Sequence, residues 1–227
     1  MTIPNGLVIF DCDGVLIDSE AIACGTISET LADFGISMSQ REALDAFVGK
    51  SENDVRLDLQ TRGLEDYDKY VASWRENLYA AFATDLKVIQ GIEALIEQLE
   101  APMCVASNSS HERLERSLGT TSIWSHFNQR VFSATDVERP KPAPDLVHHC
   151  LSSCKARPEM SIMIDDNASG VIAALAAGVT PVGFVDPNDP RENREQILRE
   201  AGAEIVATGA TDLLRALKSL SVPFRNS

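Results

Sequence analysis

The stretch Gly6-Leu-Val-Ile-Phe-Asp-Cys-Asp-Gly-Val-Leu-Ile-Asp18 decides the fold class. Its first part, Gly6–Phe10, is an unbroken apolar run, which is typical of a strand buried on both faces of a parallel sheet. Two carboxylates, Asp11 and Asp13, follow at once, and Gly14 permits a sharp turn of the backbone after them. Ligands bind beyond the carboxyl ends of such strands, so the two acids are candidates for a chemical site. A solvated turn is the competing interpretation, because Asp and Gly are favoured turn residues.

Four more short apolar runs farther along the chain predict further strands. They are Met103–Ala106, Val131–Ala134, Met160–Ile164 and Pro181–Val185. Amphipathic stretches suited to crossover helices separate several of them, and Gly170–Ala177 is one example. This alternation of strands and helices favours an α/β fold with a parallel sheet.

The segment after the first strand has a different pattern. From roughly Ser19 to Asp85 the apolar residues recur at helical spacing, and no run there is typical of a strand. Short breaks at Phe34-Gly-Ile36 and Arg62-Gly-Leu64 divide the segment into several helices. We therefore predict a helical domain over residues 19–85, inserted into a core formed by residues 1–18 and 86–227.

Three further segments place polar side chains near the ends of predicted elements. Ser107 and Asn108 could donate to a phosphate oxygen, although capping of a following helix is a compatible interpretation. Lys141 is held between two prolines and could neutralise negative charge in a site, while a surface lysine is the competing reading. Asp165 and Asp166 follow an apolar run, and they would repel the first acidic pair unless a cation lay between the two pairs. Oxygen-rich sites of this kind suit Mg²⁺.

Composition argues against several classes of partner. The net charge of −14 disfavours nucleic acid, because phosphate contacts need clustered Lys and Arg. No apolar run approaches the ~18–20 residues that a membrane span needs. The N-terminus lacks a signal-peptide pattern, so we expect a cytoplasmic protein without a membrane segment. Five cysteines without a CxxC pair make a disulfide framework unexpected.

Taken in order, the four motifs resemble the haloacid dehalogenase-like phosphohydrolase superfamily, above all its branch of small sugar-phosphate phosphatases and β-phosphoglucomutase. The motifs are DxDGVLIDSE, SN, KPxPD and DDNxxGVxAAxxAG, which begin at Asp11, Ser107, Lys141 and Asp165. The resemblance implies a Rossmann-like three-layer core with a small α-helical cap domain inserted after the first strand. It also implies Mg²⁺ dependence and phosphoryl transfer through an aspartyl-phosphate.

The resemblance assigns roles to the residues of the first three motifs. Asp11 matches the nucleophile, which is also a metal ligand. Asp13 matches the general acid/base, and its backbone carbonyl matches a second metal ligand. Ser107 and Asn108 match the phosphate-binding motif, and Lys141 matches the lysine that braces nucleophile and phosphate.

In the fourth motif, Asp166 matches the carboxylate that completes the metal site. Asp165 stands where the branch often has Glu, and the resemblance implies that it supports the metal directly or through an outer-shell contact. Asn167 stands where the branch often has Ser, a departure that we expect to matter little.

Substrate choice is expected to come from the helical insertion. Lys50 and Ser51 align roughly with the loop that faces the substrate in this branch, and they are the candidates for substrate binding. Asn53 and Arg56 are weaker candidates. A solvated helix start is the competing interpretation, since Ser51 is a good N-cap.

These features together predict a monomeric, Mg²⁺-dependent phosphatase of a small phosphorylated metabolite such as a sugar phosphate. A phosphomutase of the β-phosphoglucomutase type would keep every residue named here, so it stays open as the alternative. A haloacid dehalogenase would share the nucleophile, but that family lacks the second acid, and Asp13 counts against it. A catalytically silent binding protein is disfavoured because the catalytic set is intact.

Overall fold

The computed structural model describes residues 6–47, 52–127, 129–189 and 191–225. The chain divides into two compact units. One comprises Met1–Ile17 with Lys87–Ser227, and the other is Asp18–Leu86. Among the described residues, none of the helices has the length and apolar character that crossing a membrane requires.

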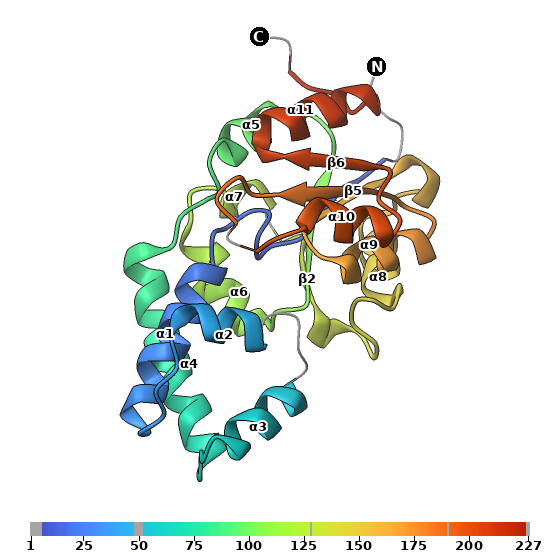
Figure 1. Cartoon of the computed structure of the whole chain (residues 1–227). Coiled ribbons are helices and arrows are strands. Elements are labelled where there is room, and N and C mark those ends of the chain that lie inside the picture. Colours follow the sequence, from blue (N-terminus) through green and yellow to red (C-terminus); the bar gives the residue numbers. More distant parts are fainter. Residues whose placement is uncertain (1–5, 48–51, 128, 190, 226–227) are drawn as a thin grey trace. The chain divides into compact units, whose positions relative to one another are not determined.

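The larger unit is built on a six-stranded parallel sheet in the order β3-β2-β1-β4-β5-β6. Figure 1 shows β5 and β6 side by side at one edge of this sheet. The strands are β1 (Val8–Phe10), β2 (Met103–Ser107), β3 (Val131–Ser133), β4 (Ile162–Asp165), β5 (Thr180–Val185) and β6 (Ile205–Thr208). This is the doubly wound order of Rossmann-like folds, and the direction of winding changes between β1 and β4. The prediction of an α/β fold on a parallel sheet is confirmed.

Helices cover both faces of this sheet. They are α5 (Ile92–Gln98), α6 (His111–Arg116), α7 (Trp124–Phe127), α8 (Asp145–Cys154), α9 (Ala168–Ala176), α10 (Arg194–Glu200) and α11 (Gly209–Ser219). Neighbouring residues of a strand point to opposite faces. Ile9 belongs to a buried cluster that it shares with α8 and α9. Phe10 instead meets Phe127 of α7 edge to face, with ring centroids 6.0 Å apart. The result is a helix–sheet–helix sandwich.

Five of the six strands lie within two residues of their predicted bounds. The predicted start at Met160 lies in a 3₁₀ turn, Pro158–Met160, and β4 begins at Ile162. The sequence pattern did not predict β6. It is a four-residue strand at the sheet edge, and Ile205 and Val206 are only partly buried, so its apolar signal is short.

The smaller unit consists of helices, and its described residues contain no strand. They are α1 (Glu20–Asp33), α2 (Gln40–Phe47), α3 (Glu52–Thr61) and α4 (Tyr67–Asp85). Gly35 and Gly63 follow α1 and α3 with φ of 77° and 97°, a conformation that favours glycine and ends a helix. Asp66 caps α4 by accepting a hydrogen bond from the Lys69 N–H.

The helical unit has its own core. Apolar side chains from all four helices form one buried cluster, in which Leu31 and Leu59 are fully inaccessible to solvent. Two polar contacts tie α4 to α1 inside it. The Trp74 indole N–H donates to Thr26 Oγ1 at 3.2 Å, and the Asn77 amide donates to Thr30 Oγ1 at 3.0 Å. Buried polar groups are stable only when they are paired in this way.

Candidate active site

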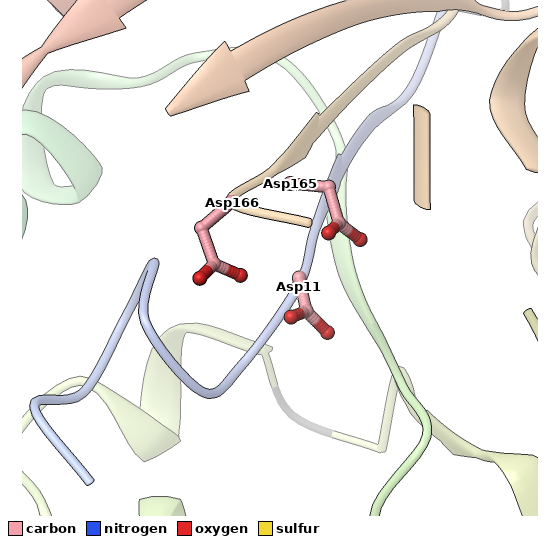
Figure 2. A group of neighbouring side chains, drawn as sticks. All are labelled: Asp11, Asp165 and Asp166. Atoms are coloured by element: carbon pink, nitrogen blue, oxygen red, sulfur yellow. The ribbon is translucent and has the colours of Figure 1, made fainter. Parts of the chain in front are cut away.

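Three carboxylates converge where the winding of the sheet changes direction (Figure 2). Asp11 directly follows β1, Asp165 ends β4, and Asp166 comes next. The Asp11 N–H donates to the Ile164 carbonyl at 2.9 Å, which holds the two strand ends side by side. One carboxylate oxygen from each acid lies within 4.8 Å of the other two. All three residues are buried, with exposed fractions of 8%, 1% and 4% in chain order.

Lys141 reaches two of these acids. Its Nζ donates to Asp11 Oδ1 at 2.8 Å and to Asp165 Oδ2 at 2.7 Å. Asn108 fixes the backbone of this lysine, because its side-chain amide donates to the Lys141 carbonyl at 2.9 Å and accepts from the Lys141 N–H at 3.1 Å. The Lys141–Pro142 peptide bond is cis. Burial alone would lower the pKa of Lys141, but the carboxylates of Asp11 and Asp165 raise it above its usual value, so the lysine is charged.

The acids carry more negative charge than one lysine balances. Burial raises the pKa of Asp11 well above its usual value, and the neighbouring charges of Asp165 and Asp166 raise it further, against the opposing effect of Lys141. Burial and Asp165 raise the pKa of Asp166 to about 6. A divalent cation would relieve both effects, and carboxylate oxygens are the ligands that Mg²⁺ prefers. The described residues therefore fit a magnesium ion at this edge of the sheet.

Asp165 has both carboxylate oxygens engaged within the protein. Oδ2 accepts from Lys141, and Oδ1 accepts from the Asn167 N–H at 2.8 Å. Gly170, in the first turn of α9, packs directly against this side chain. A Cβ atom at position 170 would lie 1.7 Å from Asp165 Oδ2, so no other residue fits there. The glycine of the fourth motif is thus explained by close packing.

Asp13 follows β1 by three residues. Its Oδ2 accepts from the Ser109 hydroxyl at 2.8 Å, and its Oδ1 lies 3.3 Å from the Arg113 Nη2. Ser109 is itself held in place, because its carbonyl accepts from the Ser133 hydroxyl at 2.7 Å. The sequence reading did not single out Ser109 or Arg113 as site residues. They follow β2 by two and six residues, so the rule that sites form beyond strand ends could have drawn attention to them.

The phosphate-binding candidates end β2. Ser107 is buried, and its Oγ accepts from the Ser109 N–H at 3.1 Å. The Asn108 side chain lies on the Lys141 backbone, as described above. Ser107 is thus the last residue of β2, and Asn108 lies between it and Ser109, the residue that contacts Asp13.

The substrate-binding candidates of the helical unit are only partly described. Lys50 and Ser51 lie outside the described residues, and so does the side chain of Asn53. Arg56 is held within the helical unit itself. Its guanidinium stacks over the Tyr67 ring at 4.3 Å, and its Nη2 lies 3.0 Å from Asp68 Oδ1.

The sequence analysis also missed a second set of site residues, which lie in the loop between β5 and α10 and at the first residue of α10. Arg191 and Arg194 both contact Asp166, and Asp189 pairs with both arginines. The same strand-end rule could have pointed to this loop. Asp186 directly follows the predicted strand Pro181–Val185, whereas Asp189, Arg191 and Arg194 lie four to nine residues beyond it.

Comparison with known proteins places this arrangement in a family. Residues 8–184 match the model of the haloacid dehalogenase-like hydrolases. The 6-phosphogluconate phosphatase of Escherichia coli (strain K12) is 31% identical over 188 residues, which cover 80% of this chain and 84% of that protein. The bifunctional riboflavin kinase/FMN phosphatase of Arabidopsis thaliana is 26% identical over 83% of this chain and 50% of its own length.

A solved structure is similar over nearly the whole chain. It is a HAD family hydrolase from Deinococcus radiodurans R1, solved with bound phosphate and sodium. Its TM-score is 0.83 at 27% identity, and the match covers 97% of this chain and 98% of that one. By the family model and by these relatives, the chain belongs to the haloacid dehalogenase-like hydrolase family.

Proposed function

We propose that this hydrolase is a Mg²⁺-dependent phosphatase of a small phosphorylated metabolite, with sugar phosphates as the first candidates. The observation that carries the proposal is the contact of one buried lysine with two of three converging carboxylates at the switch point of the sheet. The relatives support the substrate class, because the E. coli protein is named for a phosphorylated sugar acid and the A. thaliana protein for FMN.

Asp11 is the nucleophile in this proposal. A phosphate monoester dianion repels a carboxylate, so the charge of the site must be balanced before the two can meet. Lys141, 2.8 Å from Asp11, carries positive charge to the oxygens of the transferring group. A magnesium ion bound by Asp11, Asp166 and the Asp13 carbonyl would add further charge stabilisation and orient the phosphate. Asp11 then attacks phosphorus and forms an aspartyl-phosphate as the P–O bond to the alcohol breaks.

Asp13 moves the protons. In the first step it protonates the leaving alkoxide, and in the second it takes a proton from the water that hydrolyses the aspartyl-phosphate. Ser109 and Arg113 hold its carboxylate through one oxygen each, which keeps it beside the nucleophile without burying it.

Asn108 and Asp165 act through Lys141. Asn108 holds the backbone of the lysine and Asp165 holds its ammonium group, so both are positioning residues. Ser107 and the backbone around it would bind the phosphate oxygens. Selection of the substrate is assigned to the helical unit, where Lys50 and Ser51 remain the candidates.

The proposal is tested by measuring phosphate release from a panel of sugar phosphates and other small phosphomonoesters, with Mg²⁺ and with EDTA. Asp11→Asn is compared with Asp212→Asn, which changes the same group at an exposed position of α11. Metal-dependent release that is lost only in Asp11→Asn is the expected result. Release that ignores both EDTA and the Asp11 change would contradict the proposal. Isomerised sugar phosphate without net phosphate release would indicate a mutase instead.

A further inference from the structure

The loop between β5 and α10 contributes a cluster of charged side chains that the proposed mechanism does not use. It consists of Asp189 and Arg191 from this loop and Arg194, the first residue of α10, and we call it the β5 clamp. All three belong to the same unit as the sheet. Both arginines of the clamp contact one acid of the site, Asp166.

Arg191 links Asp166 to Asp189. Its Nη2 donates to Asp166 Oδ2 at 2.9 Å and to Asp189 Oδ2 at 2.6 Å, and its Nε donates to Asp189 Oδ1 at 2.8 Å. A guanidinium held in this fork geometry cannot turn without breaking several charge-assisted hydrogen bonds. Asp189 therefore fixes the direction from which Arg191 meets Asp166.

Arg194 strengthens the hold from a second direction. Its Nη2 donates to the Asp166 carbonyl and lies 3.6 Å from Asp166 Oδ2, while its Nε lies 3.5 Å from Asp189 Oδ2. Both the backbone and the side chain of Asp166 are thus tied to the clamp.

Gly14, in the turn after β1, limits the rotation of the Asp166 carboxylate. A Cβ atom at position 14 would lie 2.6 Å from Asp166 Oδ2 and 3.2 Å from Oδ1, so the turn after β1 packs tightly against this group. With Oδ2 bonded to Arg191 and the turn packed beside it, the carboxylate has little freedom to rotate. Among the described residues no hydrogen-bond donor reaches Oδ1, which leaves that oxygen for the cation.

We propose that Arg191, fixed by Asp189, is a positioning residue that makes Asp166 offer a single oxygen to the cation and thereby selects Mg²⁺ over Ca²⁺. This inference rests on the proposed metal site. Mg²⁺ requires near-octahedral geometry with few protein ligands, whereas Ca²⁺ accepts six to eight oxygens and readily takes both oxygens of one carboxylate. Occupying Oδ2 with a guanidinium removes the second oxygen that Ca²⁺ would use.

The charge of Arg191 has a separate effect that the test must exclude. A positive charge beside a metal ligand weakens the binding of every dication, and by a similar factor for Mg²⁺ and Ca²⁺. Arg191→Gln would then tighten both ions, and Asp189→Asn would weaken both. The ratio of the two dissociation constants would stay constant. Positioning makes a different prediction, because either substitution loosens the fork and lowers the preference for Mg²⁺.

The experiment is isothermal titration of the metal-free protein with MgCl₂ and, separately, with CaCl₂. We expect the ratio of the Ca²⁺ to the Mg²⁺ dissociation constant to fall about tenfold in Arg191→Gln, the size typical of lost outer-shell contacts, and to fall in Asp189→Asn as well. The matched controls are Arg215→Gln and Asp212→Asn, which break an exposed ion pair of the same kind on α11. Their ratio should match the wild-type ratio. Thermal melting of each variant verifies that it is folded.

The outcomes separate this inference from the proposed function. Mg²⁺ binding with a ratio that is unchanged in both clamp variants would overturn the role of Arg191 and leave the phosphatase proposal intact. A wild-type protein that binds neither ion would overturn the metal site and the inference together. If one clamp variant fails to fold, the other decides the question, because the two remove opposite charges and are expected to change the ratio in the same direction.

Discussion

The two acids on either side of the proposed nucleophile Asp11, which are Asp13 and Asp166, are held in different ways. Each is bound by an arginine from the segment that follows another strand: Arg113 lies in α6 after β2, and Arg191 lies in the loop after β5. Asp13 keeps 23% of its side chain exposed, and its arginine is 3.3 Å away. Asp166 keeps 6% exposed, and its arginine is 2.9 Å away. Asp13, which is more exposed to solvent, suits proton exchange with an alcohol and with water. Asp166, which is buried and held more closely, suits the binding of a cation.

Replacing Asp13 tests this division most strongly. We expect Asp13→Asn to lower turnover by about 10²- to 10⁴-fold, since an amide cannot exchange the proton. Mg²⁺ affinity should stay within about twofold of wild type, because only the backbone carbonyl of Asp13 is assigned to the metal. Steady-state rates and Mg²⁺ titration provide the two readouts. A large loss of Mg²⁺ affinity in this variant would contradict the assignment of proton transfer to Asp13 and of metal binding to Asp166.

Gly170→Ala changes the buried contacts around Asp165 and not those of Asp13. The new Cβ would lie 1.7 Å from Asp165 Oδ2, so Asp165 must leave Lys141. We expect turnover to fall by about 10- to 100-fold, the range seen when outer-shell partners are lost. The free energy of unfolding should fall by about 1–3 kcal/mol from overpacking.

Denaturant unfolding and steady-state rates measure the two effects of Gly170→Ala. Gly119→Ala is the matched control, because a Cβ there would meet its nearest neighbour at 3.6 Å, an ordinary contact. Wild-type activity in Gly170→Ala would show that the contact between Asp165 and Lys141 is dispensable.

Metal binding at the buried acid, Asp166, should also depend on pH. Burial and Asp165 raise the pKa of Asp166 to about 6, so below pH 6 a proton competes with the cation for this carboxylate. Mg²⁺ affinity should therefore rise between pH 5 and pH 7, by up to about tenfold per pH unit below the pKa, and then level off. Titration calorimetry across this range measures it. A flat profile would mean that Asp166 does not lose a proton when the metal binds.

The smallest effect on turnover is expected from a change beside the more exposed acid, Asp13. Arg113→Gln loosens Asp13 but removes only a partly exposed ion pair, which contributes less than about 1 kcal/mol. Turnover should fall about two- to fivefold, and Mg²⁺ affinity should not change. Arg215→Gln, which removes an exposed ion pair on α11, is the control. A change in Mg²⁺ affinity with Arg113→Gln would show that the two acids are coupled.

Local sequence pattern was sufficient for the centre of the site. An apolar run followed at once by acids predicts both a buried strand and its end, since burial on both faces selects apolar residues up to the point where the chain leaves the sheet. Parallel strands bring their carboxyl ends to one edge, so Asp11 and the pair at 165 and 166 could be placed together. The helical insertion was equally visible, because helical spacing is also a local property.

Only the tertiary structure decided which side chains surround those acids. Lys141 meets Asp11 across 130 residues; its two flanking prolines made it a candidate, but only the family resemblance paired it with the nucleophile. The contacts of Arg113 and Arg191 with the acids, and of Asn108 with the Lys141 backbone, depend on the paths of the segments that follow β2, β3 and β5. A loop path is set by long-range packing and hydrogen bonding, and surface arginines have no periodicity that would show which of them turns inward. The sequence by itself therefore determined where the acids gather, and the folded chain decided which of them is held rigidly and which stays exposed to water.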